Sequence, residues 1–302
     1  GKMNQSNMRK RIAYSQNFLI NKDLVAKLIS TTSITKEDHV LDIGAGQGII
    51  TDALIKSAGR VSAFEIDHVM FGVLLKKYAE QASVEIKLGD FLKHPLPNEP
   101  YKVFSNIPFN LTSSIIKRLT ESKHPPEDAY LILQKDAALR YIGKPVDKIT
   151  SQLAALLIPW FDPSIAYDFS QEDFFPRPNV EIVLMRIEKR NNPRINESNR
   201  MYFYDFITYA FNQHKPNIVE GLAKFISRKG LLNLAKKLNF DPESKPTMLT
   251  PSQWIDLFHL AFNHLDENKK SIVRGSYVRQ KELQSKLRKV NRTRLDKNWR
   301  SY

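Results

Sequence analysis

Residues 39–48, HVLDIGAGQG, decide the fold of this chain of 302 residues. The first five are largely apolar and include a β-branched residue at either end of the apolar run, which is typical of a buried strand. The glycines that follow allow positive φ angles and let a ligand approach the backbone closely. Residues 49 to 57 then predict a helix. A strand, a glycine turn and a helix in this order begin a doubly wound α/β fold, with a nucleotide site at the turn.

The spacing of the glycines narrows the choice of ligand. Gly44, Gly46 and Gly48 give the pattern G-x-G-x-G, whereas a dinucleotide site has G-x-G-x-x-G. No Lys-Ser or Lys-Thr pair follows, so the turn is not a P-loop. A turn without a phosphate clamp fits a ligand without phosphates, such as S-adenosylmethionine.

Acidic residues follow the next two predicted strands, which span residues 60 to 64 and 84 to 88. Glu65 lies about 20 residues after the glycine turn, where a carboxylate binds a ribose diol and repels the 2′-phosphate of NADP. Asp90 is placed to accept a hydrogen bond from the adenine amino group of the donor. Glu65 as a solvated surface acid and Asp90 as a cap of the following turn are the alternatives, but their joint occurrence in this order favours one ligand crevice.

The tetrapeptide Asn106-Ile107-Pro108-Phe109 follows a further predicted strand, residues 101 to 104. Adenine N6 is a poor nucleophile because its lone pair is delocalised into the ring. An amide oxygen and a nearby backbone carbonyl can accept hydrogen bonds from the two N–H groups of this amine. Pro108 fixes the turn, and Phe109 offers a flat face to an unstacked base. The alternative is an ordinary turn with Phe109 in the core.

These patterns together resemble the rRNA adenine N6-dimethyltransferases, the family that includes the Erm macrolide-resistance enzymes and the small-subunit dimethyladenosine transferases. The resemblance covers roughly residues 10 to 190 and implies a Rossmann-like class I methyltransferase sheet with a small C-terminal α-helical domain. The segments that carry it are Ser15-Gln16-Asn17-Phe18-Leu19, the glycine turn, Glu65-Ile66-Asp67, Gly89-Asp90, Asn106-Ile107-Pro108-Phe109-Asn110 and Phe174-Phe175-Pro176-Arg177-Pro178.

The resemblance also implies which residues form the site. Residues of an N-terminal lid, the glycine turn and the strand ends would bind the donor, S-adenosylmethionine: Asn17, Leu19, Gly44, Gly46, Glu65, Ile66, Asp90, Phe91 and Asn106. The catalytic residues would be Asn106, Pro108, Phe109 and Phe174, with Phe109 stacking on the flipped adenine and Phe174 closing its opposite side. The alternative for Phe174 is a core residue beside Phe175.

The branch of the family is indicated by softer features. Lys215-Pro216-Asn217 stands where small-subunit enzymes usually carry Arg-Arg-Lys, and Ile107 replaces their more common Leu. Both resemble Erm enzymes, which implies N6-(di)methylation of an adenine in the peptidyl-transferase loop of 23S rRNA and resistance to macrolides, lincosamides and streptogramin B. A small-subunit (16S-type) dimethyladenosine transferase of ribosome assembly stays open. A non-catalytic RNA-binding paralogue is disfavoured because the glycine turn and Asn106 are intact.

Charge agrees with an RNA partner. The formal net charge is +14 and the pI is about 9.7. Residues 266–302 carry more than half of this excess, with 12 Lys or Arg against 4 Asp or Glu. This stretch predicts a disordered or marginally helical tail that binds RNA phosphates, with Tyr277 and Trp299 as stacking faces. A solubility tail is the alternative.

The predicted organisation has three parts. Residues 1–190 form the donor-binding catalytic domain and begin with a basic arm, residues 3 to 20. The polar linker Asn191-Asn192-Pro193-Arg194 leads to a helical RNA-binding domain, residues 195–265, and residues 266–302 are a basic, flexible tail.

Other features set limits on partners and location. The chain has no cysteine, its histidines show no ligand spacing, and methyl transfer from a sulfonium needs no metal. There is no long apolar run and no signal peptide. We therefore expect a cytoplasmic monomer that binds neither a metal nor a membrane.

Overall fold

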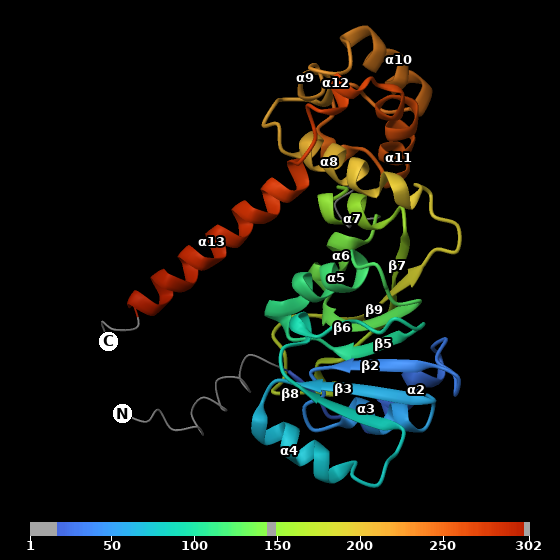
Figure 1. Ribbon diagram of the computed structural model, residues 1–302, viewed down its shortest axis with the longest axis vertical. Coiled ribbons are helices and arrows are strands. Elements are labelled where there is room, and N and C mark those ends of the chain that lie inside the picture. Colours follow the sequence, from blue (N-terminus) through green and yellow to red (C-terminus); the bar gives the residue numbers. More distant parts are fainter. Residues whose placement is uncertain (1–16, 144–148, 299–302) are drawn as a thin grey trace. The chain divides into compact units, whose positions relative to one another are not determined.

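Figure 1 shows the computed structural model of the chain, which describes residues 17–143 and 149–298. The chain divides into two compact units. The first comprises the chain up to residue 139 together with residues 161–191, and the second comprises residues 140–160 and the chain from residue 192. The predicted basic arm, residues 3 to 20, lies mostly outside the described residues, and Trp299 lies wholly outside them.

The first unit is built on a seven-stranded sheet in the order β4-β3-β2-β5-β6-β9-β7. All neighbouring strands are parallel except β9, which runs opposite to both β6 and β7. This confirms the predicted α/β class. The strands are β2 (His39–Ile43), β3 (Arg60–Glu65), β4 (Val84–Leu88), β5 (Lys102–Asn106), β6 (Asp128–Gln134), β7 (Phe161–Asp168) and β9 (Ile182–Lys189).

Helices alternate with these strands, as a parallel sheet requires. Side-chain caps begin two of them: Asn21 accepts a hydrogen bond from the N–H of Leu24, and Asp67 accepts from Val69 and Met70. The helices are α2 (Lys22–Ser30), α3 (Ile49–Ile55), α4 (His68–Lys77), α5 (Thr112–Thr120) and α6 (Lys135–Tyr141).

The order of the strands reverses direction between β2 and β5. From β2 the chain continues to β3 and β4 on one side, whereas β5 continues to β6 on the other. Open α/β sheets bind ligands at such a switch point, beyond the carboxyl ends of the strands. Regular backbone pairing of β2 with β5 covers only Val40 and Leu41, so it ends before β2 does at Ile43.

A second, two-stranded sheet lies beside the first. It pairs β1 (Phe18–Leu19) with β8 (Phe174–Phe175) in antiparallel register, so that Leu19 is opposite Phe174. The predicted lid is thereby joined to the segment that carries the predicted base-closing aromatic residue.

The second unit is helical. Its helices are α7 (Gln152–Leu157), α8 (Arg200–Phe211), α9 (Ile218–Gly221), α10 (Arg228–Leu238), α11 (Pro251–Leu260), α12 (Glu267–Lys270) and α13 (Ser276–Asn298). Phe206 of α8 is fully buried at the centre of an aromatic cluster that includes Phe225, Trp254, Phe258 and Phe262. Within the described ranges of the chain, no helix has the length and apolar character needed to cross a membrane.

Two parts of this unit differ from the sequence-based expectation. Residues 140–160, assigned to the catalytic domain by sequence, belong to the second unit because α7 packs on α8 and α11. The stretch 266–302, predicted to be disordered or marginally helical, contains α12 and the long helix α13. Tyr277, predicted to be a stacking face, is only 4% exposed and packs on Tyr204; a buried ring cannot stack on a base.

Candidate active site

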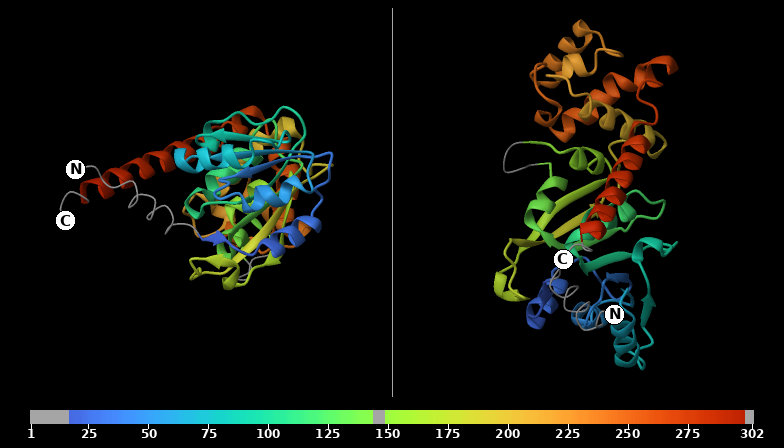
Figure 2. Two further views of the ribbon diagram at one scale, coloured as in Figure 1. Left: turned by 90° about the horizontal axis from the view of Figure 1, so that it is seen from below. Right: turned by 90° about the vertical axis from the view of Figure 1, so that its left-hand side faces the viewer.

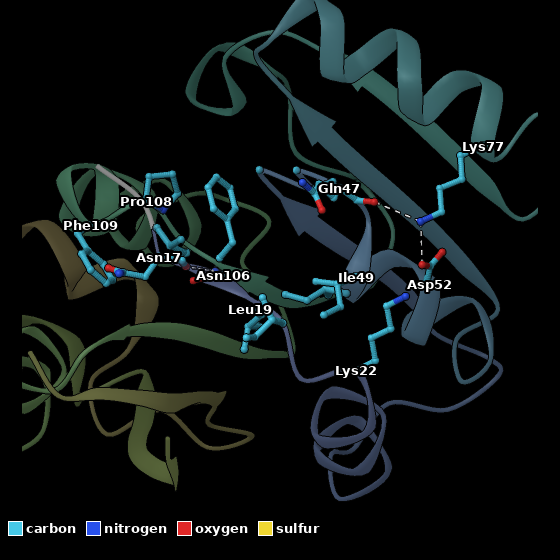
Figure 3. Close-up of a pocket in the computed structure, with 17 residues that line it drawn as sticks. Asn17, Leu19, Lys22, Gln47, Ile49, Asp52, Lys77, Asn106, Pro108 and Phe109 are labelled. Carbon is cyan, nitrogen blue, oxygen red and sulfur yellow. Dashed lines mark hydrogen bonds and ion pairs between the residues drawn. The ribbon is translucent and has the colours of Figure 1, made fainter. Parts of the chain in front are cut away.

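A cavity of about 280 Å³ lies at the switch point of the sheet, within the first unit (Figure 3). Its walls come from the lid, the glycine turn and the start of α3, and the turn after β5. The lining residues are Asn17, Phe18, Leu19, Ile20, Lys22, Gly44, Ala45, Gly46, Gln47, Ile49, Ile50, Asp52, Lys77, Asn106, Ile107, Pro108 and Phe109. Seven of the residues predicted from sequence are therefore brought together: Asn17, Leu19, Gly44, Gly46, Asn106, Pro108 and Phe109.

The two ends of the cavity differ in chemistry, as Figure 3 shows. At one end lie Asn106, Pro108 and Phe109, which offer an amide and an aromatic ring. At the other end Lys77 forms an ion pair of 2.8 Å with Asp52. The only carboxylate among the lining residues is thus held away from the Asn106 end.

Hydrogen bonds hold the lid, which comprises residues 17–21, at the Asn106 end of the cavity. The side-chain amide of Asn17 donates to the carbonyl of Pro176 at 2.6 Å. The N–H of Ile20 donates to the carbonyl of Asp173 at 2.9 Å, and the amide of Asn21 donates to the Asp173 carboxylate at 3.1 Å. The lid and the segment around β8 therefore form one hydrogen-bonded element.

The side chain of Asn106 is oriented by the same lid. Its Nδ2 donates to the backbone carbonyl of Asn17 at 3.1 Å. This bond orients the amide, and among the residues that the structure describes no donor reaches its Oδ1, which can therefore accept a hydrogen bond from a ligand.

The backbone carbonyls of Ile107 and Pro108, in the turn after β5, differ in their hydrogen bonding. The carbonyl of Pro108 accepts the N–H of Leu111 at 2.9 Å. Within the described part of the chain, no donor reaches the carbonyl of Ile107. The sequence predicted a carbonyl near Pro108 as the second acceptor for an amine, and Ile107 provides the one that is not already bonded.

The glycine turn is held by β3. Gly46 has a φ of +57°, and a Cβ there would meet no protein atom within 4 Å, since the space in front of it is open. Its N–H donates to Glu65 Oε2 at 3.0 Å. Glu65 therefore supports the turn, and burial raises the pKa of its carboxyl even though the N–H groups of Gly46 and Asp67 oppose the shift.

Ser105 joins the two strands where their regular pairing has ended. Its hydroxyl donates to the carbonyl of Ile43 at 2.5 Å and accepts the N–H of Ile43 at 3.1 Å. This bridge holds the end of β2, which leads into the glycine turn, against the end of β5, which carries Asn106. Ser105 is fully buried.

Other predicted residues lie outside the cavity lining. Asp90 accepts the N–H of Leu92 at 3.0 Å and so caps a short turn. Phe91 is buried and packs edge-to-face on Phe64, with ring centroids 5.0 Å apart. Ile66 is 65% exposed next to Glu65. Donor binding by these side chains stays a prediction.

The two aromatic residues predicted at the target base are placed differently. Phe109 is half-buried and lines the cavity. Phe174 is 3% exposed and packs on Phe169 in the core, with ring centroids 5.3 Å apart, whereas its neighbour Phe175 is 69% exposed. In this arrangement Phe174 has no free face, so its predicted contact with a base requires the ring to turn out of this packing.

The sequence-based prediction missed several lining and supporting residues, among them three with ionisable side chains. Lys22 and Lys77 line the cavity, but charged residues at helix ends are common and gave no signal. Asp42 did give one, since it is an acid within an apolar strand. It is buried, and among the described residues its Oδ1 has no hydrogen-bond partner while Oδ2 accepts the Thr51 hydroxyl at 2.7 Å.

Comparisons with known proteins identify the family of this chain. The sequence model of the family described as ribosomal RNA adenine dimethylase matches residues 7–262. The chain belongs to the ribosomal RNA adenine dimethylase family. It is an rRNA adenine N6-methyltransferase, and S-adenosylmethionine is its methyl donor.

Relatives come from both branches of the family. The small-subunit rRNA methyltransferase A of Mycoplasmopsis pulmonis is 28% identical over 252 residues, which cover 83% of this chain and 98% of that protein. The rRNA adenine N-6-methyltransferase of Bacillus licheniformis is also 28% identical, over 255 residues that cover 84% and 88%. The crystal structure of the 23S rRNA methyltransferase ErmE has the same fold, with a TM-score of 0.73, 24% identity and coverage of 80% and 98%.

The cavity fits the methyl donor on its own features. The open space in front of Gly46 admits a ligand against the backbone of the turn. Glu65 carries its carboxylate at the edge of the same turn, and Ile66 beside it exposes an apolar side chain. Among the described residues, no three His, Asp or Glu side chains gather as a metal site would require.

Proposed function

We propose that this enzyme methylates N6 of an adenine in large-subunit rRNA, in the peptidyl-transferase loop, and so confers resistance to macrolides, lincosamides and streptogramin B. The observation that carries the methylation chemistry is the Asn106 amide, whose nitrogen is bonded to the lid while its oxygen remains for a target amine. A cytoplasmic location goes with this proposal. The functional division of the chain into catalytic and RNA-binding parts is likewise proposed.

In this mechanism S-adenosylmethionine supplies a methyl group on a positively charged sulfur. Asn106 Oδ1 and the Ile107 carbonyl accept hydrogen bonds from the two N–H groups of adenine N6. These bonds hold the lone pair of N6 towards the cavity. Phe109 supports the base by stacking. Glu65 would hold the ribose of the donor, with Gly44 and Gly46 against its methionine part, while Asn17 and Leu19 exclude water. Positioning of this kind is worth roughly 7–11 kcal/mol when the geometry is right.

The segment after α8 favours the large subunit as the target. Here the chain reads His214-Lys215-Pro216-Asn217, and both Lys215 and Pro216 are exposed. Asn217 caps α9 by accepting the N–H of Glu220 at 3.0 Å. The segment thus presents one lysine and a proline turn, where small-subunit enzymes usually carry Arg-Arg-Lys.

Small-subunit rRNA is the second candidate target. The relative from Mycoplasmopsis pulmonis, named as a small-subunit enzyme, is covered over 98% of its length at the same 28% identity as the other branch. Overall identity therefore does not separate the two branches.

A methyl-transfer assay separates these targets directly. Deproteinised large-subunit and small-subunit rRNA are each incubated with the enzyme and radiolabelled donor, and the modified adenine is mapped by primer extension. We expect label on a single adenine of the large-subunit RNA. Label on small-subunit RNA alone would assign the enzyme to ribosome assembly, and label on neither would contradict the proposed activity.

The role of Asn106 is tested by Asn106→Ala. We expect loss of transfer, because the alanine cannot accept a hydrogen bond from N6, with little change in thermal unfolding because Asn106 is only partly buried. Asn110→Ala, at an exposed position of the same turn, is the control. Full transfer by the Asn106 variant would show that the assignment is wrong.

A further inference from the structure

Helix α13 is fastened to the second unit at its first turn. Asp205 of α8 is 3% exposed. Its carboxylate accepts the N–H groups of Gly275 and Tyr277, each at 3.0 Å. A carboxylate at a helix N-terminus satisfies otherwise unpaired donors and favours the helix dipole. Gln280 adds a bond of 2.8 Å to Gln152, so the start of the helix is fixed on the core of this unit.

Helix α13 is exposed beyond this attachment, over residues 281–289. From residue 281 to 289 every side chain is exposed, including Leu283 at 59% and Leu287 at 55%. The helix extends away from the other helices of its unit (Figures 1 and 2). At 1.5 Å per residue, its 23 residues reach about 34 Å. An element that is fixed at one end and exposed over residues 281–289 is suited to contact a partner.

The charge on α13 identifies that partner. Between residues 279 and 289 there is one acid, Glu282, and the basic residues are Arg279, Lys281, Lys286, Arg288 and Lys289. At 100° per residue, the pair Lys281 and Arg288 lies on a different side of the helix from the pair Arg279 and Lys286. The helix is therefore cationic on more than one side, which fits a chain of phosphates. A second copy of this helix would bring an equal positive charge.

We propose that α13 is a cationic arm that binds the phosphate backbone of the RNA substrate. This rests on the proposed function and adds a second contact surface to it. The arm follows the segment that the family model matches, which ends at residue 262. Phosphate contacts position a protein without reading sequence, so α13 raises affinity and leaves the choice of adenine to the rest of the chain.

The test compares two variants with the same change in net charge. One replaces Lys281, Lys286, Arg288 and Lys289 by Gln, which keeps helix propensity. The matched control replaces four exposed lysines of the first unit by Gln: Lys27, Lys56, Lys76 and Lys123. Affinity for the rRNA that the wild type methylates is measured by fluorescence anisotropy over a series of salt concentrations, and donor affinity by calorimetry.

We expect the α13 variant to bind RNA at least about tenfold more weakly at low salt, with the slope of log K against log salt shallower by about 3, because each phosphate contact contributes roughly 0.7 to 0.9. The control should keep most of the wild-type slope, and both variants should bind the donor normally. Equal losses in the two variants would show that overall charge is responsible, and would overturn the proposal.

Two other outcomes would also overturn it. If the α13 variant kept wild-type RNA affinity while the wild type methylated rRNA, the arm would be refuted and the proposed function would stand. If sedimentation showed a wild-type dimer that Leu283→Gln with Leu287→Gln dissociates without changing RNA affinity, α13 would be a contact between copies. A wild type that methylates no rRNA would instead refute the proposed function itself.

Discussion

Asp42 is a buried carboxyl with an unusual balance of interactions. Burial raises its pKa from 3.8 to about 7, and nearby Glu65 adds to the shift, while the hydroxyl of Thr51 opposes it. The folded chain therefore holds this proton more tightly than the unfolded chain does. Unfolding between about pH 4 and pH 7 releases a proton, so the contribution of Asp42 to stability is fully present below pH 4 and is lost as the pH rises to about 7.

This predicts the effect of Asp42→Asn. The amide keeps an oxygen for Thr51 and cannot ionise, so the free energy of unfolding should gain up to about 4 kcal/mol relative to wild type between pH 4 and pH 8. Urea unfolding at several pH values measures this gain. Asp162→Asn, at an exposed position of β7, is the control. Its free energy of unfolding should differ from that of the wild type by the same amount at every pH. If the difference between Asp42→Asn and wild type were also the same at every pH, the raised pKa of Asp42 would be contradicted.

Phe109 is the residue whose ring is expected to carry the flipped base. Phe109→Ala should lower kcat/KM for rRNA by about tenfold to a hundredfold, because stacking on an aromatic ring is worth roughly 1–3 kcal/mol per base. Phe109→Tyr keeps the ring face and should stay near wild type. If Phe109 only packs against the core, the alanine variant will unfold more easily but transfer methyl normally per folded molecule.

Single residues differed in how well their place could be predicted. Gly44, Gly46 and Asn106 line the cavity as expected, because each belongs to a short motif that directly follows a strand. Phe174 was harder, since two adjacent aromatic residues on a strand point to opposite faces and sequence does not say which is buried. The structure buries Phe174 and exposes Phe175.

Among the elements, the buried strands were the most predictable. β2 and β4 have the expected bounds, and β3 and β5 differ by one or two residues at an end. Their apolar runs are short and end at turn residues, which limits the choice of register. Helix ends were less certain: α3 spans Ile49–Ile55, although the sequence predicted a helix over residues 49 to 57. Local propensity does not fix the point at which packing ends a helix.

The lid offers a test of how elements hold the donor. Asn21 caps α2 through its oxygen and ties the lid to Asp173 through its nitrogen. Asn21→Ser keeps an N-capping oxygen and removes the tie. We expect donor affinity, measured by calorimetry, to fall about twofold to tenfold, since one hydrogen bond contributes about 0.5–1.5 kcal/mol.

The matched control for the lid is Asn196→Ser. Asn196 caps a short turn in the second unit by accepting the N–H of Ser198 at 3.2 Å, and it contributes nothing to the cavity lining. Its replacement should leave donor affinity unchanged. Equal effects of the two substitutions would mean that the tie between Asn21 and Asp173 does not hold the lid.

The division of the whole molecule was only partly accessible from sequence. The polar linker at residues 191–194 marks a point where the chain changes unit, and its composition is visible in the sequence. Residues 140–160 gave no such signal. Their place in the second unit depends on the packing of α7 against α8 and Trp160 against Phe203, whose ring centroids are 5.7 Å apart. Contacts between distant parts of the chain are not encoded in local patterns.

Since every residue that lines the cavity belongs to the first unit, damage to the second unit should spare donor binding. Phe206→Ala removes the centre of the aromatic cluster and should destabilise the second unit by about 3–5 kcal/mol. We expect normal donor affinity by calorimetry, together with loss of rRNA methylation.

Phe104→Ala is the matched change in the first unit, where Phe104 is fully buried on β5 and stacks on Tyr130, and it should weaken donor binding. If Phe206→Ala abolished donor binding as well, the two units would depend on each other for folding, and the cavity could not be treated as a property of the first unit alone.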